Sequence, residues 1–149
     1  AELHGPNCTA EQVLAATDYV VPAIEIIDSR FSGFKFDLPS VIADNGSSAR
    51  FVPGTNRYAP DALDLCTIHV ALEKNGEPVA SGMSDAVLGN PAIAIAMLVN
   101  LLAEHGETLP AQSFVMSGAI TEAIPVKPGD SIRAQFDGMG EIAIQFRST

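Results

Sequence analysis

Basic residues and cysteines are scarce in this chain, and each shortage excludes a class of protein. Eight Lys and Arg residues stand against 18 Asp and Glu, which gives a formal net charge of −10 at pH 7. Binding to nucleic acid needs a basic footprint, so we expect no nucleic-acid partner. Only two cysteines occur, Cys8 and Cys66, which cannot form a disulfide framework and favour a cytoplasmic location.

Long apolar runs and common active-site motifs are also missing. The longest apolar run, 92–102, is interrupted by Asn100, so we predict no membrane span. The three histidines lack zinc-ligand spacing, and the chain has neither a Gly-rich phosphate loop nor a Gly-x-Ser-x-Gly elbow. The chain has 149 residues, of which 47% are hydrophobic and 17% charged. This length and composition are typical of one well-packed domain.

Start and stop signals predict the helices. Thr9 and Gln12 fit a capping box, in which each side chain satisfies the other residue's backbone N–H. Asn90 suits an N-cap, Pro91 a first turn, and Gly106 a helix stop. We therefore predict helices at 10–17, 38–43 and 91–105, of which the last is the one long helix.

Strand signals fill much of the remaining chain. Continuous apolarity over 19–27 predicts a strand buried on both faces. The alternation over 66–73, the turn signal Asn75-Gly76 and the returning segment 78–81 predict a hairpin. Further strands are expected at 50–52, 114–117, 132–136 and 142–146. Many strands with one long helix indicate an α+β fold.

The apolar segment 19–27 contains one carboxylate and leads into further charged side chains. Glu25 lies within the segment, and Asp28 and Arg30 follow it. A carboxylate that points into an apolar interior must be paired, neutralised or bound to a metal. The polar segment 43–50 follows closely, so we expect the two segments to form the walls of one oxyanion-binding, metal-assisted active site.

Several ordered motifs, which begin with Glu25-Ile26-Ile27-Asp28-Ser29-Arg30, resemble the hydratase/decarboxylase branch of the fumarylacetoacetate hydrolase superfamily. The other similar segments are 34–38, 43–48, 87–91, 116–121 and 125–130, and the resemblance runs over 3–146. It implies a mixed β-roll around a divalent metal, usually Mg²⁺, with Mn²⁺ as a substitute. The implied reaction is decarboxylation of 4-oxalocrotonate (2-oxo-3-hexenedioate). Hydration of 2-hydroxy-dienoates is the alternative reaction, and a non-catalytic assembly module is a third hypothesis.

The resemblance also assigns roles to individual residues. Glu25 matches one of three metal-binding carboxylates. The Glu-x-Glu pair that supplies the other two, and the catalytic Lys, lie upstream in the family and have no match here, so we expect the C-terminal portion of a longer enzyme. Asn45 and Ser47 are the candidate catalytic residues. The candidate substrate-binding residues are Arg30, Ser48, Ser117, Gly118 and Thr121. The implied partners are a small 2-oxo dicarboxylate, further copies of the chain and the partner hydratase, with the helix face 92–102 at an interface.

Each candidate residue also has a purely structural interpretation. Glu25 could form an ion pair with Arg30 or with Arg50. Arg30 could clamp a substrate carboxylate or orient Asp28. The segments 45–48 and 117–121 could simply close turns, because Asn, Ser and Gly are common turn residues.

Overall fold

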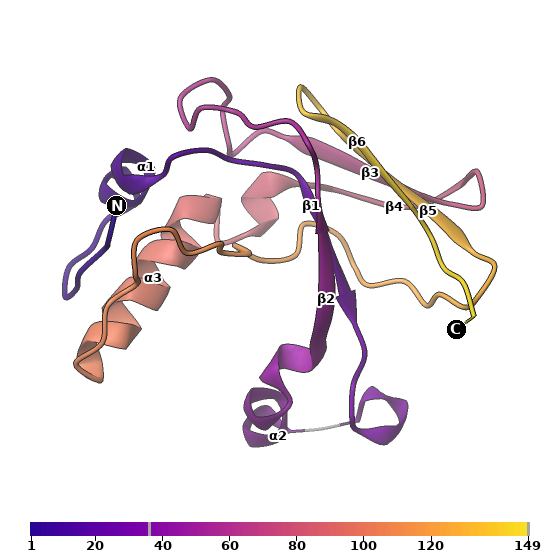
Figure 1. Ribbon diagram of the computed structural model, residues 1–149, viewed down its shortest axis with the longest axis horizontal. Coiled ribbons are helices and arrows are strands. Elements are labelled where there is room, and N and C mark those ends of the chain that lie inside the picture. Colours follow the sequence, from indigo (N-terminus) through magenta and orange to yellow (C-terminus); the bar gives the residue numbers. More distant parts are fainter. Residues whose placement is uncertain (36, 149) are drawn as a thin grey trace.

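The computed structural model describes residues 1–35 and 37–148 and has two sheets and three α-helices (Figure 1). The helices are α1 (Ala10–Ala16), α2 (Leu38–Ala43) and α3 (Pro91–Glu104). The strands are β1 (Ala23–Ile27), β2 (Ser48–Pro53), β3 (His69–Lys74), β4 (Glu77–Met83), β5 (Ser131–Phe136) and β6 (Gly140–Gln145). The predicted α+β class with one long helix is confirmed.

The helices begin where the sequence predicts them. Thr9 and Gln12 form the capping box that opens α1. The Asn90 side chain accepts a hydrogen bond from the Ala92 N–H at the start of α3, and Gly106 follows its end with φ +73°. These caps satisfy backbone groups that a helix terminus otherwise leaves without partners.

The larger sheet is antiparallel throughout and has the order β4-β3-β5-β6. The predicted hairpin is confirmed, since β3 and β4 meet at Asn75 and Gly76, both with positive φ. The predicted strand 66–73 begins only at His69, and 114–117 is not a strand. Those four residues make no ladder with any described strand, and a strand requires a partner.

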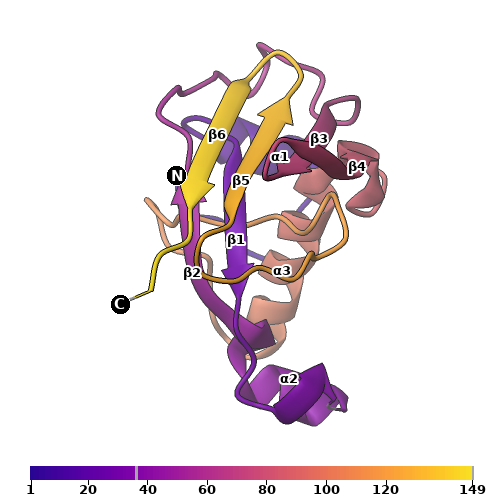
Figure 2. The same ribbon diagram turned by 90° about the vertical axis from the view of Figure 1, so that its right-hand side faces the viewer.

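The smaller sheet is a two-stranded antiparallel ribbon made of β1 and β2. Figures 1 and 2 show it between the four-stranded sheet and the helices α1 and α3, with α2 at its far end. The predicted strand 19–27 is shorter than expected, and no residue of β1 is buried. The prediction that this strand is buried on both faces is therefore wrong, because the described residues leave β1 partly open to solvent.

Two hydrophobic clusters stabilise these layers. One lies on the larger sheet and receives Ile24 and Val52 from the ribbon, and its buried members are Ile68, Val70, Ala134, Phe136, Met139 and Ile142. The other joins α1 to α3 through Cys8, Val13, Ala92, Ala96 and Val99. Asn100 fixes the N-terminal segment to α3, because its side chain bonds the Cys8 N–H at 2.7 Å and the Cys8 carbonyl at 3.0 Å.

The stretch Ser84–Glu104 is long and apolar enough, by length and composition alone, to cross a membrane. This differs from the prediction made from the run 92–102. A core helix of a soluble protein can have the same length and apolar composition, so these two properties alone do not identify a membrane span.

Candidate functional site

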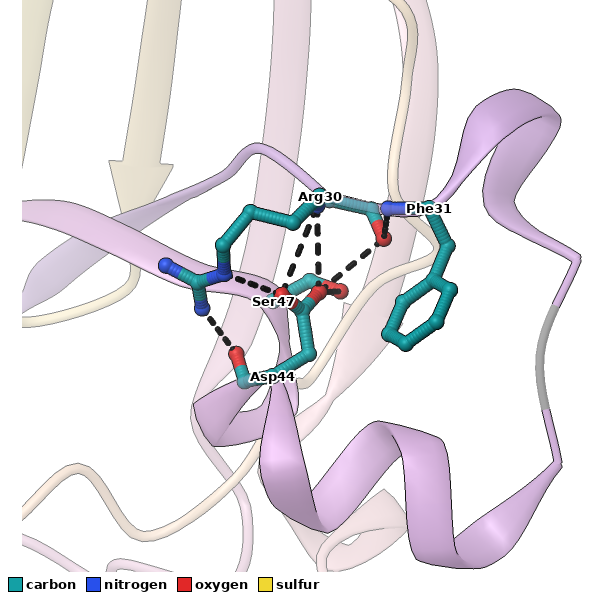
Figure 3. Close-up of polar contacts among 5 residues, drawn as sticks. Arg30, Phe31, Asp44 and Ser47 are labelled. Atoms are coloured by element: carbon teal, nitrogen blue, oxygen red, sulfur yellow. Dashed lines mark hydrogen bonds and ion pairs between the residues drawn. The ribbon is translucent and has the colours of Figure 1, made fainter.

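A buried carboxylate, Asp44, organises the end of the ribbon where β1 leaves and β2 begins. Its side chain is 1% exposed. It accepts hydrogen bonds from the hydroxyls of Ser47 at 2.7 Å and Ser29 at 3.0 Å, and from the Arg30 backbone N–H (Figure 3). The Arg30 Nε donates to the same carboxylate, and Nη2 donates to the Asp44 carbonyl. Asp44 therefore ties residues 29 and 30 to the turn that contains Ser47.

The same contacts set the charge state of Asp44. Hydrogen bonds from Ser47, then from Arg30 and Ser29, lower its pKa from 3.8 to about 2, although burial acts in the opposite direction. The carboxylate is therefore ionised at neutral pH. We did not predict this role, and the available signal was one acid among Ser, Asn and Gly residues with an arginine nearby in sequence.

The contacts of Arg30 bear on its two expected roles, which were to clamp a substrate carboxylate or to orient Asp28. Arg30 bonds Asp44, so the interpretation in which it orients Asp28 is wrong. The Asp28 backbone N–H instead donates to the Ser47 carbonyl at 2.8 Å. The Arg30 side chain is 63% exposed, so part of its guanidinium faces solvent.

Glu25 lies in the middle of β1, opposite Phe51 of β2. Alternation along the strand puts Glu25 and Ala23 on one face of the ribbon, together with Phe51. Phe51 stacks on Phe114, with ring centroids 4.9 Å apart. Glu25 therefore lies on the side of the ribbon that faces the segment after α3.

The surroundings of Glu25 differ from the expectation in two ways. Glu25 is exposed among the described residues, which therefore do not enclose it, and its inward position in the intact enzyme stays a prediction. Among residues 1–35 and 37–148 it also has no ion pair with Arg30 or Arg50. The structural ion-pair interpretation therefore has no support here.

A cavity of about 800 Å³ lies between α1, the start of β1, α3 and the segment that follows α3. Its walls are mainly apolar and include Val13, Leu14, Ile95, Met116, Phe136 and Met139. Ser117 and Gly118 line it, and so does Ala23 from the face of the ribbon that carries Glu25. An apolar cavity with a few polar groups is a common form of small-molecule site.

The predicted site residues fall into separate groups. Ser117 and Gly118 line the cavity, whereas Thr121 lies just beyond it. Asn45, Ser47 and Ser48 lie at the other end of the ribbon, around Asp44, and Ser47 is buried there with its hydroxyl committed to that carboxylate. This chain therefore does not bring all the candidates into one cavity.

The described residues contain no cluster of three or more His, Cys, Asp or Glu side chains that could hold a metal ion. A magnesium site in proteins needs several oxygen ligands in near-octahedral arrangement. Glu25, whose carboxylate is exposed and has no ion pair within the described part of the chain, fits one such ligand. The described residues alone do not complete the site.

Comparison of the sequence with known proteins finds relatives that are enzymes of one class. No protein-family model matches the chain. Its relatives are decarboxylases and hydratases of small acids, so the resemblance to a hydratase/decarboxylase branch is confirmed. The chain is 55% identical over 146 residues to a 4-oxalocrotonate decarboxylase of Pseudomonas sp. (strain CF600), covering 98% of this chain and 55% of that enzyme. It is 40% identical to a 2-hydroxyhexa-2,4-dienoate hydratase of Comamonas testosteroni, covering 97% and 55%.

A solved structure extends the comparison to the fold. The 4-oxalocrotonate decarboxylase from Pseudomonas putida G7, complexed with magnesium and adipate, matches with a TM-score of 0.95 and 51% identity, covering 98% of this chain and 56% of that one. The chain is thus homologous to 4-oxalocrotonate decarboxylases over the part of them that it matches. It spans about half the length of these relatives.

Proposed function

We propose that this chain forms part of a magnesium-dependent enzyme that decarboxylates 4-oxalocrotonate to 2-hydroxypenta-2,4-dienoate in aromatic meta-cleavage catabolism. The supporting observation is its 55% identity to a decarboxylase over 98% of the chain, against 40% to a hydratase. Adipate, bound in the similar structure, is a six-carbon dicarboxylate like this substrate. The fold is proposed to be the mixed β-roll of the fumarylacetoacetate hydrolase type.

The reaction breaks the bond between C5 and C6 of the substrate. The electron pair of that bond moves through the C3–C4 double bond to the 2-oxo group as CO₂ leaves, and protonation of the resulting dienolate oxygen gives the product. A bound divalent cation would supply a Lewis acid for the negative charge that develops on the 2-oxo oxygen. We propose Glu25 as one ligand of Mg²⁺, or of Mn²⁺ in its place, with the other ligands outside the matched part.

The chain's own residues have three proposed tasks. The Ser117 hydroxyl and the Gly118 N–H, with Thr121 close by, are suited to donate hydrogen bonds to a substrate carboxylate. The apolar cavity walls keep water from the reacting carbons, which suits decarboxylation better than hydration. Arg30, whose side chain is partly exposed, and Ser48 also stay proposed substrate-binding residues, but they lie at the other end of the ribbon and do not line the cavity that Ser117 and Gly118 line.

Asn45 and Ser47 remain the proposed catalytic residues, with different tasks. Asn45 is exposed and free to present its amide to substrate or water. The Ser47 hydroxyl is buried and donates to Asp44, so in the described residues it acts through that carboxylate, whose pKa it lowers, and not by direct contact with a substrate.

Hydration of 2-hydroxypentadienoate is the second candidate, supported by hydratase relatives at 33 to 40% identity. Both reactions use the same electron sink at the 2-oxo group. We also propose a cytoplasmic homo-oligomer that can associate with the partner hydratase. A non-catalytic assembly role is the alternative for the isolated chain, given its incomplete metal site.

A mutation of Glu25 tests the proposal. In the intact enzyme that carries this sequence, we expect Glu25→Gln to reduce magnesium affinity by at least about tenfold, since it removes a ligand. Turnover of 2-oxo-3-hexenedioate, followed by CO₂ release, should fall with it. Glu77→Gln, which changes an exposed acid at the β3–β4 turn, is the control and should retain the parent values.

Two results would contradict the proposal. Unchanged magnesium binding and turnover in Glu25→Gln would remove Glu25 from the metal site. Hydration of 2-hydroxypentadienoate without CO₂ release from 2-oxo-3-hexenedioate would replace the decarboxylase by the hydratase.

A further inference from the structure

Two acids are buried among residues 1–35 and 37–148, Asp44 and Asp130, and each organises a turn. Each forms an ion pair with a basic side chain and accepts a hydrogen bond from a backbone N–H. Hydrogen bonds, above all from Ser47 to Asp44 and from Asn75 to Asp130, lower the pKa of each carboxyl from 3.8 to about 2. Asp44 differs from Asp130 in what its basic partner still presents to solvent.

Arg30, the basic partner of Asp44, keeps one edge of its guanidinium open. Nε donates to the Asp44 carboxylate and Nη2 to the Asp44 carbonyl, which occupies one edge (Figure 3). Nη1 is directed away from Asp44, and no acceptor for it lies in the part of the chain that the structure describes. Nη1 and the outer N–H of Nη2, which we call the open edge of Arg30, form a fork that matches the two oxygens of a carboxylate.

Lys74, the partner of Asp130, has no such open group. Its side chain is 25% exposed, against 63% for Arg30, and its ammonium also donates to the Pro125 carbonyl at 2.7 Å. An ammonium has no planar fork for a carboxylate. The contacts of Asp130 therefore serve the fold, whereas those of Asp44 also orient an exposed binding group.

Asp44 holds a turn with unusual backbone geometry as well. Asn45, Gly46 and Ser47 all have positive φ, at 53°, 64° and 59°. Residues other than glycine visit this left-handed region rarely, and then singly, so three in succession need support from their surroundings. The Asp44 carbonyl accepts from the Ser47 N–H at 2.9 Å, and its carboxylate accepts from the Ser47 hydroxyl at 2.7 Å. The exposed Asn45 is one peptide bond from the carbonyl that Arg30 contacts.

We propose that Asp44 is a positioning residue of the enzyme, which fixes the open edge of Arg30 and the adjacent Asn45 for a carboxylate of the substrate. That this ligand is a dicarboxylate rests on the proposed function. A guanidinium already held on one side loses less conformational entropy when it binds an anion. In a chain with a net charge of −10, a dianion needs such a local and oriented cation.

Adipate binding tests this role in the intact, magnesium-loaded enzyme that carries this sequence. Adipate, which is bound in the similar decarboxylase structure, has no 2-oxo group and so cannot undergo the proposed reaction. Asp44→Asn removes the charge that holds Arg30, and we expect calorimetry to show adipate affinity at least about tenfold lower. Magnesium affinity should keep the parent value, because Asp44 bonds Ser29, Arg30 and Ser47 and not Glu25.

A double-mutant cycle separates positioning from a general loss of stability. Arg30→Lys keeps the charge without the planar fork, and alone it should weaken adipate binding about tenfold. Because Asp44 acts through Arg30, the double variant Asp44→Asn, Arg30→Lys should bind adipate about as weakly as either single variant. Asp130→Asn is the matched control: it should lower stability to urea as Asp44→Asn does and bind adipate as the parent does.

Four results overturn the inference. They are parent adipate affinity in Asp44→Asn, effects that multiply in the double variant, an equal loss of adipate affinity in Asp130→Asn, and a loss of magnesium affinity in Asp44→Asn, which would assign Asp44 to the support of Glu25. If Asp44→Asn does not fold, Ser29→Ala takes its place, since it removes one donor to Asp44 and no charge, with an expected loss of about threefold. The expected coupling without CO₂ release from 2-oxo-3-hexenedioate keeps the positioning role and refutes only the proposed reaction.

Discussion

Replacing Asn100 with Ala should detach the N-terminal segment from α3. The Asn100 amide bonds both backbone groups of Cys8, at 2.7 Å and 3.0 Å, and Cys8 itself is only 7% exposed. Without the amide, a buried N–H and a buried carbonyl lose their partner. Each such loss costs about 1–3 kcal/mol, so we expect a total of about 3 kcal/mol for the two together.

The Cys8 thiol reports this loss directly. A cost of about 3 kcal/mol corresponds to about a hundredfold larger open population, because each 1.4 kcal/mol is a factor of ten. If opening limits access, labelling of Cys8 by a thiol reagent should accelerate by the same factor. Peptide mass spectrometry separates Cys8 from Cys66, the other free cysteine.

Urea unfolding followed by circular dichroism gives an independent value for the same change. Asn56→Ala is the control, since Asn56 is exposed in a loop, and a surface substitution of this kind should shift stability by less than about 0.5 kcal/mol. An Asn100→Ala protein that labels at the parent rate and unfolds at the parent urea concentration would refute the reasoning.

Two further predictions concern other parts of the fold. Because the pKa of Asp44 is lowered from 3.8 to about 2, its contribution to stability is complete above pH 3.8 and is lost as the pH falls towards 2. Thermal unfolding between pH 5 and pH 2 should show this loss, and Asp44→Asn should flatten it; an unchanged slope would contradict the assignment. A Cβ at Gly82 would lie 2.2 Å from the Ile120 carbonyl oxygen, so Gly82→Ala should destabilise the protein by about 1–3 kcal/mol. Ser81→Ala, a neighbour with an exposed side chain, should lie within about 0.5 kcal/mol of the parent in urea unfolding, and equal values for the two variants would show that β4 moves to accept the methyl group.

Local signals in the sequence predicted the helices and the hairpin well. The caps at Thr9 and Asn90 and the turn at Asn75 involve contacts between residues a few positions apart, so a short segment contains the whole cause. The stretch 38–43 was predicted with its observed bounds for the same reason.

Features that depend on distant partners were predicted less well. The segment 114–117 has strand-forming residues but finds no partner strand, and β1 has an apolar sequence without the expected burial. The role of Asp44 arises from contact with Ser29 and Arg30, which only the folded chain brings to it. The proposed metal ligand Glu25 depends on groups beyond the described residues, so neither its sequence context nor this structure completes that site.

The position of β3 in the larger sheet constrains when the protein can fold. β3 pairs on one side with β4, its neighbour in sequence, and on the other with β5, which the chain reaches only after α3 and the long segment beyond it. Pairing over such a separation has a large loop-closure cost and slows folding. During synthesis the β3–β4 hairpin therefore waits with an open edge until β5 has left the ribosome, and in this interval that edge is exposed to aggregation.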